Sequence, residues 1–218
     1  KADGIPIADF LVFDYGNRDQ ISFDEVKSRL GLPLFVKPAN MGSSVGISKV
    51  SDEKSFEAAI DRAFQYDTKI IIEENIRGRE IECSVLGNEN PVASLPGEIL
   101  TQAEFYSYEA KYIDENGAVL EIPAKLPPDK VKEIQELSLR TYASLCCEGM
   151  ARVDFFLKDN GELVVNEINT IPGFTRISMY PKLWEATGLN YSQLIDRLID
   201  LALKRYEREK ALKTNVDL

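Results

Sequence analysis

The chain has 218 residues, enough for one large or two small globular domains. Hydrophobic residues make up 44% and charged residues 28%, a balance typical of soluble globular proteins. The net charge is −10 and no basic run occurs, which argues against nucleic acid or an anionic membrane as a partner. The chain has no histidine, so mechanisms that need an imidazole base are excluded within it.

The cysteines indicate a reducing environment. Cys83, Cys146 and Cys147 have neither metal-ligand spacing nor the even number of a disulfide framework. We therefore expect reduced thiols and a cytoplasmic location. No run approaches the ~20 apolar residues of a membrane-spanning helix. No signal peptide is seen, but Lys1 is not an initiator methionine, so this absence carries little weight.

The first ninety residues have the signals of a small α+β lobe. Ser22 and Glu25 have the spacing of a capping box, which predicts that a helix begins there. Ser51 or Asp52 caps a second helix, in which apolar residues recur at helical spacing. Strands are expected at 33–37, 47–50, 69–73 and 80–86.

A larger lobe is predicted for the rest of the chain, so the expected domains are residues 1–90 and 91–218. Residues 95–128 are rich in Gly and Pro and are interpreted as strand pieces around a long loop, 105–112, of a kind that often forms a functional lid. Amphipathic helices are expected at 129–146 and 191–206. The apolar face of the last helix would consist of Leu194, Ile195, Leu198, Ile199 and Ala202.

Two apolar runs, 151–157 and 163–168, flank Asp159-Asn160-Gly161, and Asn-Gly between such runs is a strong hairpin signal. A two-residue turn at Asn160-Gly161 fixes which residues lie opposite each other. A three-residue loop with a bulge would shift this register by one. The predicted cross-strand pairs are Asp154 with Glu167, Arg152 with Asn169, and Phe156 with Val165.

This register places two carboxylates opposite each other, with the amide of Asn169 two residues beyond Glu167. Opposed carboxylates repel, so the arrangement predicts a hard cation between Asp154 and Glu167. Mg²⁺ takes one or two carboxylates and completes its shell with phosphate oxygens and water. The alternative is a solvated sheet face that carries unrelated charges.

Residues 35–46 form a second candidate site, with two glycines, two serines and Lys37. Glycines let backbone N–H groups approach phosphate oxygens, and serines add hydroxyl donors. Lys37 precedes the glycines, so this is not a Walker A loop. A plain hairpin connection is an equally common alternative, but a lysine that closes a buried strand needs an anion.

The segment 150–157, Met-Ala-Arg-Val-Asp-Phe-Phe-Leu, followed by 165–175, Val-Asn-Glu-Ile-Asn-Thr-Ile-Pro-Gly-Phe-Thr, resembles the metal-binding end of D-alanine–D-alanine ligases. These belong to the ATP-grasp superfamily. The resemblance covers nearly the whole chain from about Gly4. It implies an α+β ATP-grasp fold, with nucleotide bound between two antiparallel-rich sheets of two α+β subdomains.

The resemblance also implies an activity. Such ligases use ATP to join two D-alanines through an acyl phosphate, for peptidoglycan precursor synthesis. The chain matches the central and carboxy-terminal domains. The family's amino-terminal domain, which carries the first D-alanine subsite, has no counterpart in it, so we expect a longer ligase that forms a homodimer.

The resemblance assigns nucleotide contacts to both lobes. Lys37 would contact the α-phosphate, and Ser43 and Ser44 would cover the β- and γ-phosphates. Backbone groups around Glu73, Glu74 and Ile76 would read adenine; many relatives have lysine where Glu74 stands, which leaves its side-chain contact open. The remaining candidates are Glu80 for the ribose, Ile47 and Phe156 for the base, Lys111 for phosphate oxygens, and Asn166, for which a plain sheet position is favoured.

The resemblance implies that Asp154, Glu167 and Asn169 hold two Mg²⁺ ions, or Mn²⁺. Arg152 would stabilise the acyl phosphate and the tetrahedral intermediate. The candidates for the remaining contacts are the Gly173 N–H for the oxyanion, and Ser178 with the Met179 amide for the carboxylate of the second D-alanine.

Tyr112 favours D-alanine as the second substrate, since ligases that make D-alanyl-D-lactate lack it, and it would join a network with Ser43. We also expect residues 103–115 to act as a lid. The alternatives are a D-alanine–D-serine or D-alanine–D-lactate ligase, or a non-catalytic ATP-binding module. Such a module could lose the metal ligands, whereas all three are present.

Overall fold

The computed structural model describes residues 1–101 and 118–213 and divides into two compact units. The smaller unit is built on Ile7–Gly78, and the larger on Lys1–Pro6, Arg79–Leu100 and Leu120–Leu218. Each unit has its own sheet, so each is described by itself. In the described part of the chain, no helix has both the length and the apolar character needed to cross a membrane.

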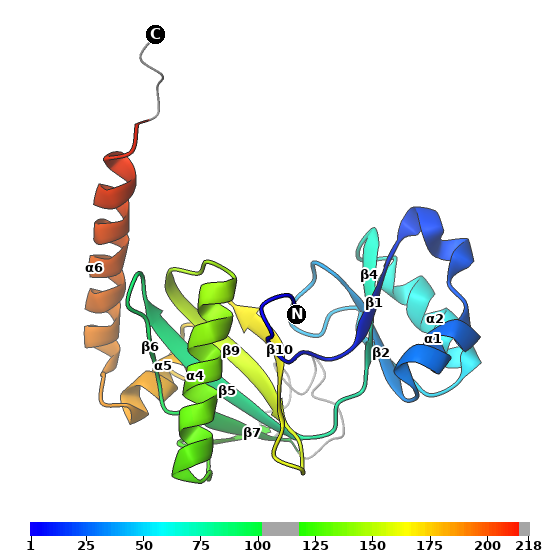
Figure 1. The fold of residues 1–218 in the computed structure, drawn as a ribbon, viewed down its shortest axis with the longest axis horizontal. Coiled ribbons are helices and arrows are strands. Elements are labelled where there is room, and N and C mark those ends of the chain that lie inside the picture. The colour runs from blue at the N-terminus through cyan, green and yellow to red at the C-terminus, as the bar shows by residue number, and fades with distance from the viewer. Residues whose placement is uncertain (102–117, 214–218) are drawn as a thin grey trace. The chain divides into compact units, whose positions relative to one another are not determined.

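The smaller unit is a four-stranded antiparallel sheet with two helices on one face (Figure 1). The strand order is β1-β4-β2-β3. Its core joins Val26 and Leu30 of the first helix to Phe56 and Ile60 of the second. The elements are β1 (Phe10–Asp14), a 3₁₀ turn (Tyr15–Gln20), α1 (Phe23–Leu30), β2 (Leu34–Pro38), β3 (Ser48–Val50), α2 (Glu53–Ala63) and β4 (Lys69–Glu74).

The caps explain where these helices begin. The Ser22 hydroxyl accepts a hydrogen bond from the Glu25 N–H at 3.4 Å, as the sequence predicts. Asp52, rather than Ser51, caps α2, and the Ser55 side chain completes a reciprocal capping box. Both predicted helices are confirmed, and the strands expected at 33–37, 47–50 and 69–73 are confirmed to within one residue as β2, β3 and β4.

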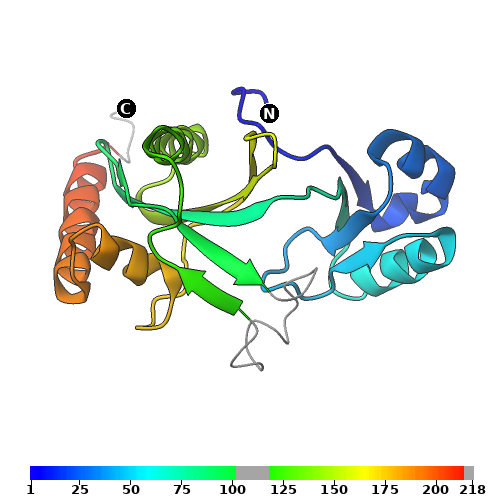
Figure 2. The same cartoon turned by 90° about the horizontal axis from the view of Figure 1, so that it is seen from below.

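The larger unit contains a six-stranded sheet in the order β10-β9-β5-β7-β8, with β6 paired to β5. Helix α4 lies across one face of this sheet, and α5 and α6 lie on the other (Figures 1 and 2). The elements are β5 (Arg79–Gly87), β6 (Val92–Ala93), β7 (Gly97–Thr101), β8 (Ala118–Glu121), α4 (Pro128–Ser144), β9 (Gly149–Leu157), β10 (Leu163–Asn169), α5 (Met179–Ala186) and α6 (Tyr191–Lys210).

Alternation along β5 sends its side chains to the two faces in turn. Cys83 points toward α4, where Ser138 is a neighbour, and its burial raises the pKa of the thiol to about 11. Glu82 points the other way. Its cross-strand partner is Gly97, and a Cβ at Gly97 would come within 2.8 Å of Leu183 on α5. The α5 side of the sheet is therefore the side on which Glu82 lies.

The division between the units differs from the predicted boundary near residue 90. β5 pairs with β9 along its whole length, from Arg79 to Gly87, so it belongs to the larger sheet. The first residues also join this unit, because the Val165 N–H donates to the Pro6 carbonyl at 2.8 Å. The smaller unit is thus inserted between two segments of the larger one.

The two helices after the hairpin depart most from the sequence prediction. Helix α5 was not predicted, because it has only eight residues and contains Pro181. A proline in the first turn is tolerated, since its missing N–H would have no helical acceptor. The predicted apolar face of α6 is partly wrong, because Ile195 and Ile199 are 37% and 54% exposed, whereas Leu194 is fully buried.

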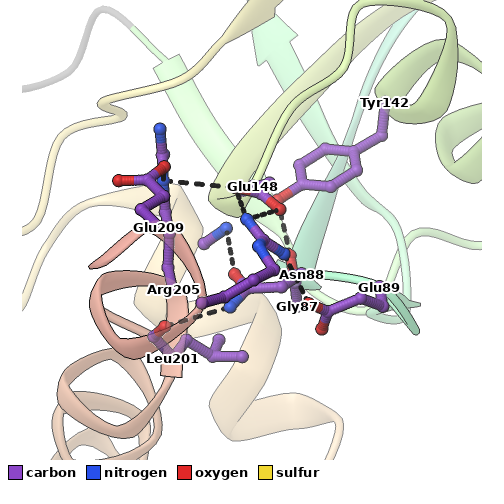
Figure 3. Close-up of polar contacts among 10 residues, drawn as sticks. Gly87, Asn88, Glu89, Tyr142, Glu148, Leu201, Arg205 and Glu209 are labelled. Carbon is purple, nitrogen blue, oxygen red and sulfur yellow. Dashed lines mark hydrogen bonds and ion pairs between the residues drawn. The ribbon is translucent and has the colours of Figure 1, made fainter. Parts of the chain in front are cut away.

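The C-terminal half of α6 contacts residues that directly follow β5 and directly precede β9 (Figure 3). Arg208 forms two hydrogen bonds with Glu148, at 2.6 and 2.7 Å, and also contacts Glu89. The Asn88 amide donates to the Leu201 carbonyl at 3.0 Å. Because Arg208 is 41% exposed, its ion pairs contribute little individually.

A buried hydrogen bond in the same region has a larger expected effect. Tyr142, which is 1% exposed, donates from its hydroxyl to the Gly87 carbonyl at 2.8 Å. We predict that Tyr142→Phe lowers the free energy of unfolding by about 1 kcal/mol, because the buried carbonyl loses its donor. Urea unfolding measures this. Tyr206→Phe, at a 58% exposed position, is the control and should leave stability unchanged. Equal values for the two variants would contradict the prediction.

Candidate functional site

The hairpin β9–β10 brings the candidate metal ligands together. Its loop has three residues, because the Lys158 N–H donates to the Glu162 carbonyl at 2.9 Å. Near this loop Phe156 lies opposite Val164, so the predicted pairing with Val165 is wrong. A bulge between Val165 and Glu167 then shifts the register by one residue.

Beyond the bulge, Asp154 lies opposite Glu167 and Arg152 lies opposite Asn169, as predicted. The predicted two-residue turn is wrong, but its error cancels, because the loop and the bulge each change the register by one. Asn166 is the extra residue of the bulge and is exposed.

The three predicted metal ligands converge on one face of the sheet. The Asn169 side-chain amide donates to Asp154 Oδ2 and to Glu167 Oε1, each at 3.1 Å. Its partly positive N–H₂ group therefore lies between two carboxylates. A 180° rotation of the amide would present its oxygen instead.

These donors fit a hard cation such as Mg²⁺, which prefers carboxylate and carbonyl oxygens. Within residues 1–101 and 118–213, no group of three or more His, Cys, Asp or Glu side chains is arranged to hold a metal ion. The candidate set is therefore two acids and one amide, and neutral Asn169 is the third member.

Arg152 is hydrogen-bonded to Asp154 and forms an ion pair with Glu82. Its Nε lies 2.7 Å from Asp154 Oδ1 and 2.9 Å from Glu82 Oε2, and its Nη2 donates to Asp154 Oδ2 at 2.7 Å. The three side chains are only 18%, 13% and 7% exposed for Arg152, Asp154 and Glu82. Burial by itself would lower the pKa of Arg152, but Asp154, Glu82 and Glu167 outweigh this effect and raise the pKa. The site therefore contains a permanent cation.

Glu82 was not among the predicted site residues. The available signal was alternation along β5, which puts Glu80 and Glu82 on the same face. Glu82 lies opposite Asp154, and Glu80 lies opposite Phe156. The predicted ribose acid and the predicted base-stacking residue are thus neighbours on the face that carries the metal ligands.

Gly173 and Ser178 belong to one tight loop before α5. The Thr175 N–H donates to Ser178 Oγ at 3.0 Å, and the Ser178 N–H donates to the Thr175 carbonyl at 3.0 Å. A Cβ at Gly173 would come within 3.1 Å of Ser178 Oγ. The backbone of Gly173 therefore lies close to the Ser178 hydroxyl, and the buried Met179 begins the helix.

The candidates in the smaller unit lie on two adjacent strands. Lys37 Nζ lies 2.6 Å from Glu73 Oε2, and each side chain is 22% exposed. Glu73 therefore supplies the negative charge that pairs with this lysine. Glu74 Oε1 accepts a hydrogen bond from the Asp9 N–H at 2.8 Å. The side chain of Glu74 is thus engaged with the start of β1. Ile76 follows β4 and is partly buried.

The loop between β2 and β3 has an unusual backbone. Ser43 and Ser44 have φ of 53° and 60°, and the Val45 N–H donates to the Gly42 carbonyl at 3.1 Å. Left-handed conformations are unfavourable for residues with a Cβ, and such strain is most common at functional sites. Ile47, at the end of this loop, is partly buried. Lys111, Tyr112 and the predicted lid at 103–115 lie outside the described residues.

At Gly46 this loop packs closely against Pro38 and Tyr66. Gly46 has φ of +75°, and a Cβ would lie 2.7 Å from Pro38 Cγ and 2.8 Å from Tyr66 Cδ2. We predict that Gly46→Ala lowers the free energy of unfolding by roughly 1–3 kcal/mol, because the methyl group overpacks a strained position. Thermal and urea unfolding measure this. Gly42→Ala is the control in the same loop, because a Cβ there would meet no atom within 4 Å. A Gly46→Ala variant as stable as Gly42→Ala would refute the prediction.

Comparison with known proteins agrees with this geometry. The family model described as "D-ala D-ala ligase C-terminus" matches residues 1–200. The D-alanine–D-alanine ligase of Oceanobacillus iheyensis is 56% identical over 99% of this chain and 59% of its own length. D-alanine–D-alanine ligase A of Escherichia coli is 56% identical over 98% of this chain and 58% of its own length. The chain thus spans less than two thirds of these curated relatives.

Comparison with solved structures points to the same family of ligases. The D-alanine-D-alanine ligase from Coxiella burnetii superposes with a TM-score of 0.83 at 40% identity, over 96% of this chain and 56% of that one. The VanG D-Ala:D-Ser ligase from Enterococcus faecalis has a TM-score of 0.83 at 39% identity, over 92% and 58%. The matched model, the sequence identities and the two α+β units together show that the chain belongs to the D-alanine–D-alanine ligase family and has its ATP-grasp fold.

Proposed function

We propose that this chain supplies the nucleotide, metal and second-substrate sites of an ATP-dependent ligase that joins two D-alanines for peptidoglycan synthesis. One observation carries the proposal: Arg152 lies beside Asp154, Glu167 and Asn169 on one sheet face. Phosphoryl and acyl transfer need charge neutralisation and positioning more than a strong base. A fixed cation beside hard oxygen ligands meets that need in a chain without histidine.

The larger unit would bind the reacting groups. Asp154, Glu167 and Asn169 would hold Mg²⁺ or Mn²⁺, and the bound metal would neutralise phosphate charge. Arg152 would stabilise the negative charge that develops on the acyl phosphate and then on the tetrahedral carbon. The Gly173 N–H would donate to the oxyanion. Ser178 and the Met179 amide would bind the carboxylate of the second D-alanine, while Glu80 would accept hydrogen bonds from the ribose.

The smaller unit would bind the rest of the nucleotide. Lys37 would contact the α-phosphate and exchange its Glu73 partner for that anion. Ser43 and Ser44 would donate to the β- and γ-phosphates. The backbone from Glu73 to Ile76 would read adenine, which is supported by the engagement of the Glu74 side chain elsewhere.

D-alanine is the favoured second substrate, because the curated relatives at 56% identity are named D-alanine–D-alanine ligases. D-serine is the second candidate, because a D-Ala:D-Ser ligase superposes with the same TM-score as a D-alanine ligase. The cytoplasmic location inferred from the cysteines and the homodimer implied by the resemblance stay predictions.

The first test separates binding from turnover. Residues 1–218 should bind Mg-ATP weakly by calorimetry but form no D-alanyl-D-alanine, because the family's first D-alanine subsite has no counterpart in them. A chimera in which they replace the matching part of E. coli D-alanine–D-alanine ligase A should release ADP with D-alanine. Comparing D-alanine, D-serine and D-lactate in the chimera assigns the substrate. A chimera that binds Mg-ATP but releases ADP with none of the three would refute the proposed activity.

The metal site has its own test in that chimera. Asp154→Asn should slow ADP release by on the order of 100-fold, the scale for losing one group that stabilises transition-state charge. Asp159→Asn makes the same change of charge at an exposed position of the same hairpin and should retain full activity. Equal rates for the two variants would rule out Asp154 as a metal ligand.

A further inference from the structure

We propose that Glu82 is a positioning residue that holds Arg152 in the active site while Asp154 binds the metal. This inference rests on the proposed function. Arg152 and Asp154 both lie on β9, whereas Glu82 lies on the neighbouring strand β5. Arg152 Nε lies 2.9 Å from Glu82 Oε2 and 2.7 Å from Asp154 Oδ1, and therefore sits between the two acids.

The proposal starts from a competition for Asp154. Both of its carboxylate oxygens are hydrogen-bonded to Arg152 at 2.7 Å, and Oδ2 also accepts from Asn169. A Mg²⁺ ion on Asp154 would need an oxygen at about 2.0–2.1 Å. The guanidinium and the metal are both cations, so they compete for the same carboxylate and repel each other.

Glu82 resolves this competition. When the metal takes Asp154, the guanidinium keeps a carboxylate partner on the neighbouring strand. Without that partner, Arg152 would either stay on Asp154 and oppose the metal, or leave the position from which it acts on the reacting groups. Glu82 is only 7% exposed, and a buried carboxylate is costly unless it is paired. Its pairing with Arg152 is therefore the observation to explain.

A purely structural role for Glu82 is the competing explanation, and the same sheet contains a matched control. Glu98 is 4% exposed and binds Arg79 through two hydrogen bonds, at 2.8 and 2.6 Å. It lies opposite Ile81, so it is on the other face of the sheet from Glu82. Glu98 is thus a buried acid paired with an arginine, here 40% exposed, away from the candidate metal ligands.

The test measures metal binding rather than turnover. Electron paramagnetic resonance of free Mn²⁺ gives the affinity of residues 1–218 and of their Glu82→Gln and Glu98→Gln variants, with ADP present. We expect Glu82→Gln to weaken Mn²⁺ binding by roughly 10-fold, the scale for residues that orient metal ligands. Glu98→Gln should lower the unfolding midpoint and leave the Mn²⁺ affinity unchanged.

A second measurement follows Arg152 itself. Nitrogen-15 NMR of arginine Nε–H groups, assigned with Arg152→Lys, reports how fast this proton exchanges with water. In the wild-type chain the proton should stay protected after Mg²⁺ and ADP are added. In Glu82→Gln it should be protected without Mg²⁺ and lose protection when Mg²⁺ is added. Should Glu82→Gln fail to fold, Glu82→Asp keeps the charge, shortens the reach, and should give a smaller change in the same direction.

The outcomes distinguish this inference from the proposed function. Unchanged Mn²⁺ affinity and unchanged protection in the Glu82 variants, with a wild-type chain that binds Mn²⁺, would overturn the role of Glu82 alone. An equal loss of affinity in Glu98→Gln would also overturn it, because the effect would then be general destabilisation. A wild-type chain that binds no Mn²⁺ would overturn the proposed metal site and this inference with it.

Discussion

The Arg152 guanidinium, held between Asp154 and Glu82, is the interaction on which the candidate site depends. It lets three strands place their acids on one partly buried sheet face. Asp154, Glu82 and Glu167 carry three negative charges at close range, and such a face is unfavourable without cations. The guanidinium supplies one positive charge, and a divalent metal would supply the rest. The stability of the site and its chemistry therefore have the same electrostatic origin.

Much of the fold could be predicted from local sequence signals. Ser22 and Asp52 start helices through caps that involve only neighbouring residues, and the apolar spacing within α2 predicts its buried face. Helix α5 could not be predicted in this way, since it is short, contains Pro181, and depends on packing against the sheet through Leu183 and Trp184. The inward face of α6 was also misjudged, because apolar residues occur on both sides of this helix.

The site was predictable where it depends on pairing within one hairpin, and less so where it depends on a distant strand. The convergence of Asp154, Glu167 and Asn169 was predicted, although the register was right only because loop and bulge cancel. Glu82 is separated from Arg152 by seventy residues of sequence, and no local pattern joins them. Likewise, the sequence predicted an anion for Lys37, but only the pairing of β2 with β4 identifies Glu73.

The insertion of the smaller unit has a consequence for how the chain folds. The strands of its sheet, from β1 to β4, lie in one continuous stretch of the chain, so this sheet can form as soon as β4 is available. The larger unit must instead wait for partners that come late in the sequence. The Gly4 carbonyl accepts from Arg140, Asp3 contacts Ser144, and Pro6 is paired only when β10 is made. Contacts of such long range are slow to form, because the intervening loop must be closed first. During synthesis, residues 1–6 could therefore begin to dock only after α4 has left the ribosome, and the pairing of Pro6 with β10 would mark the completion of the larger sheet.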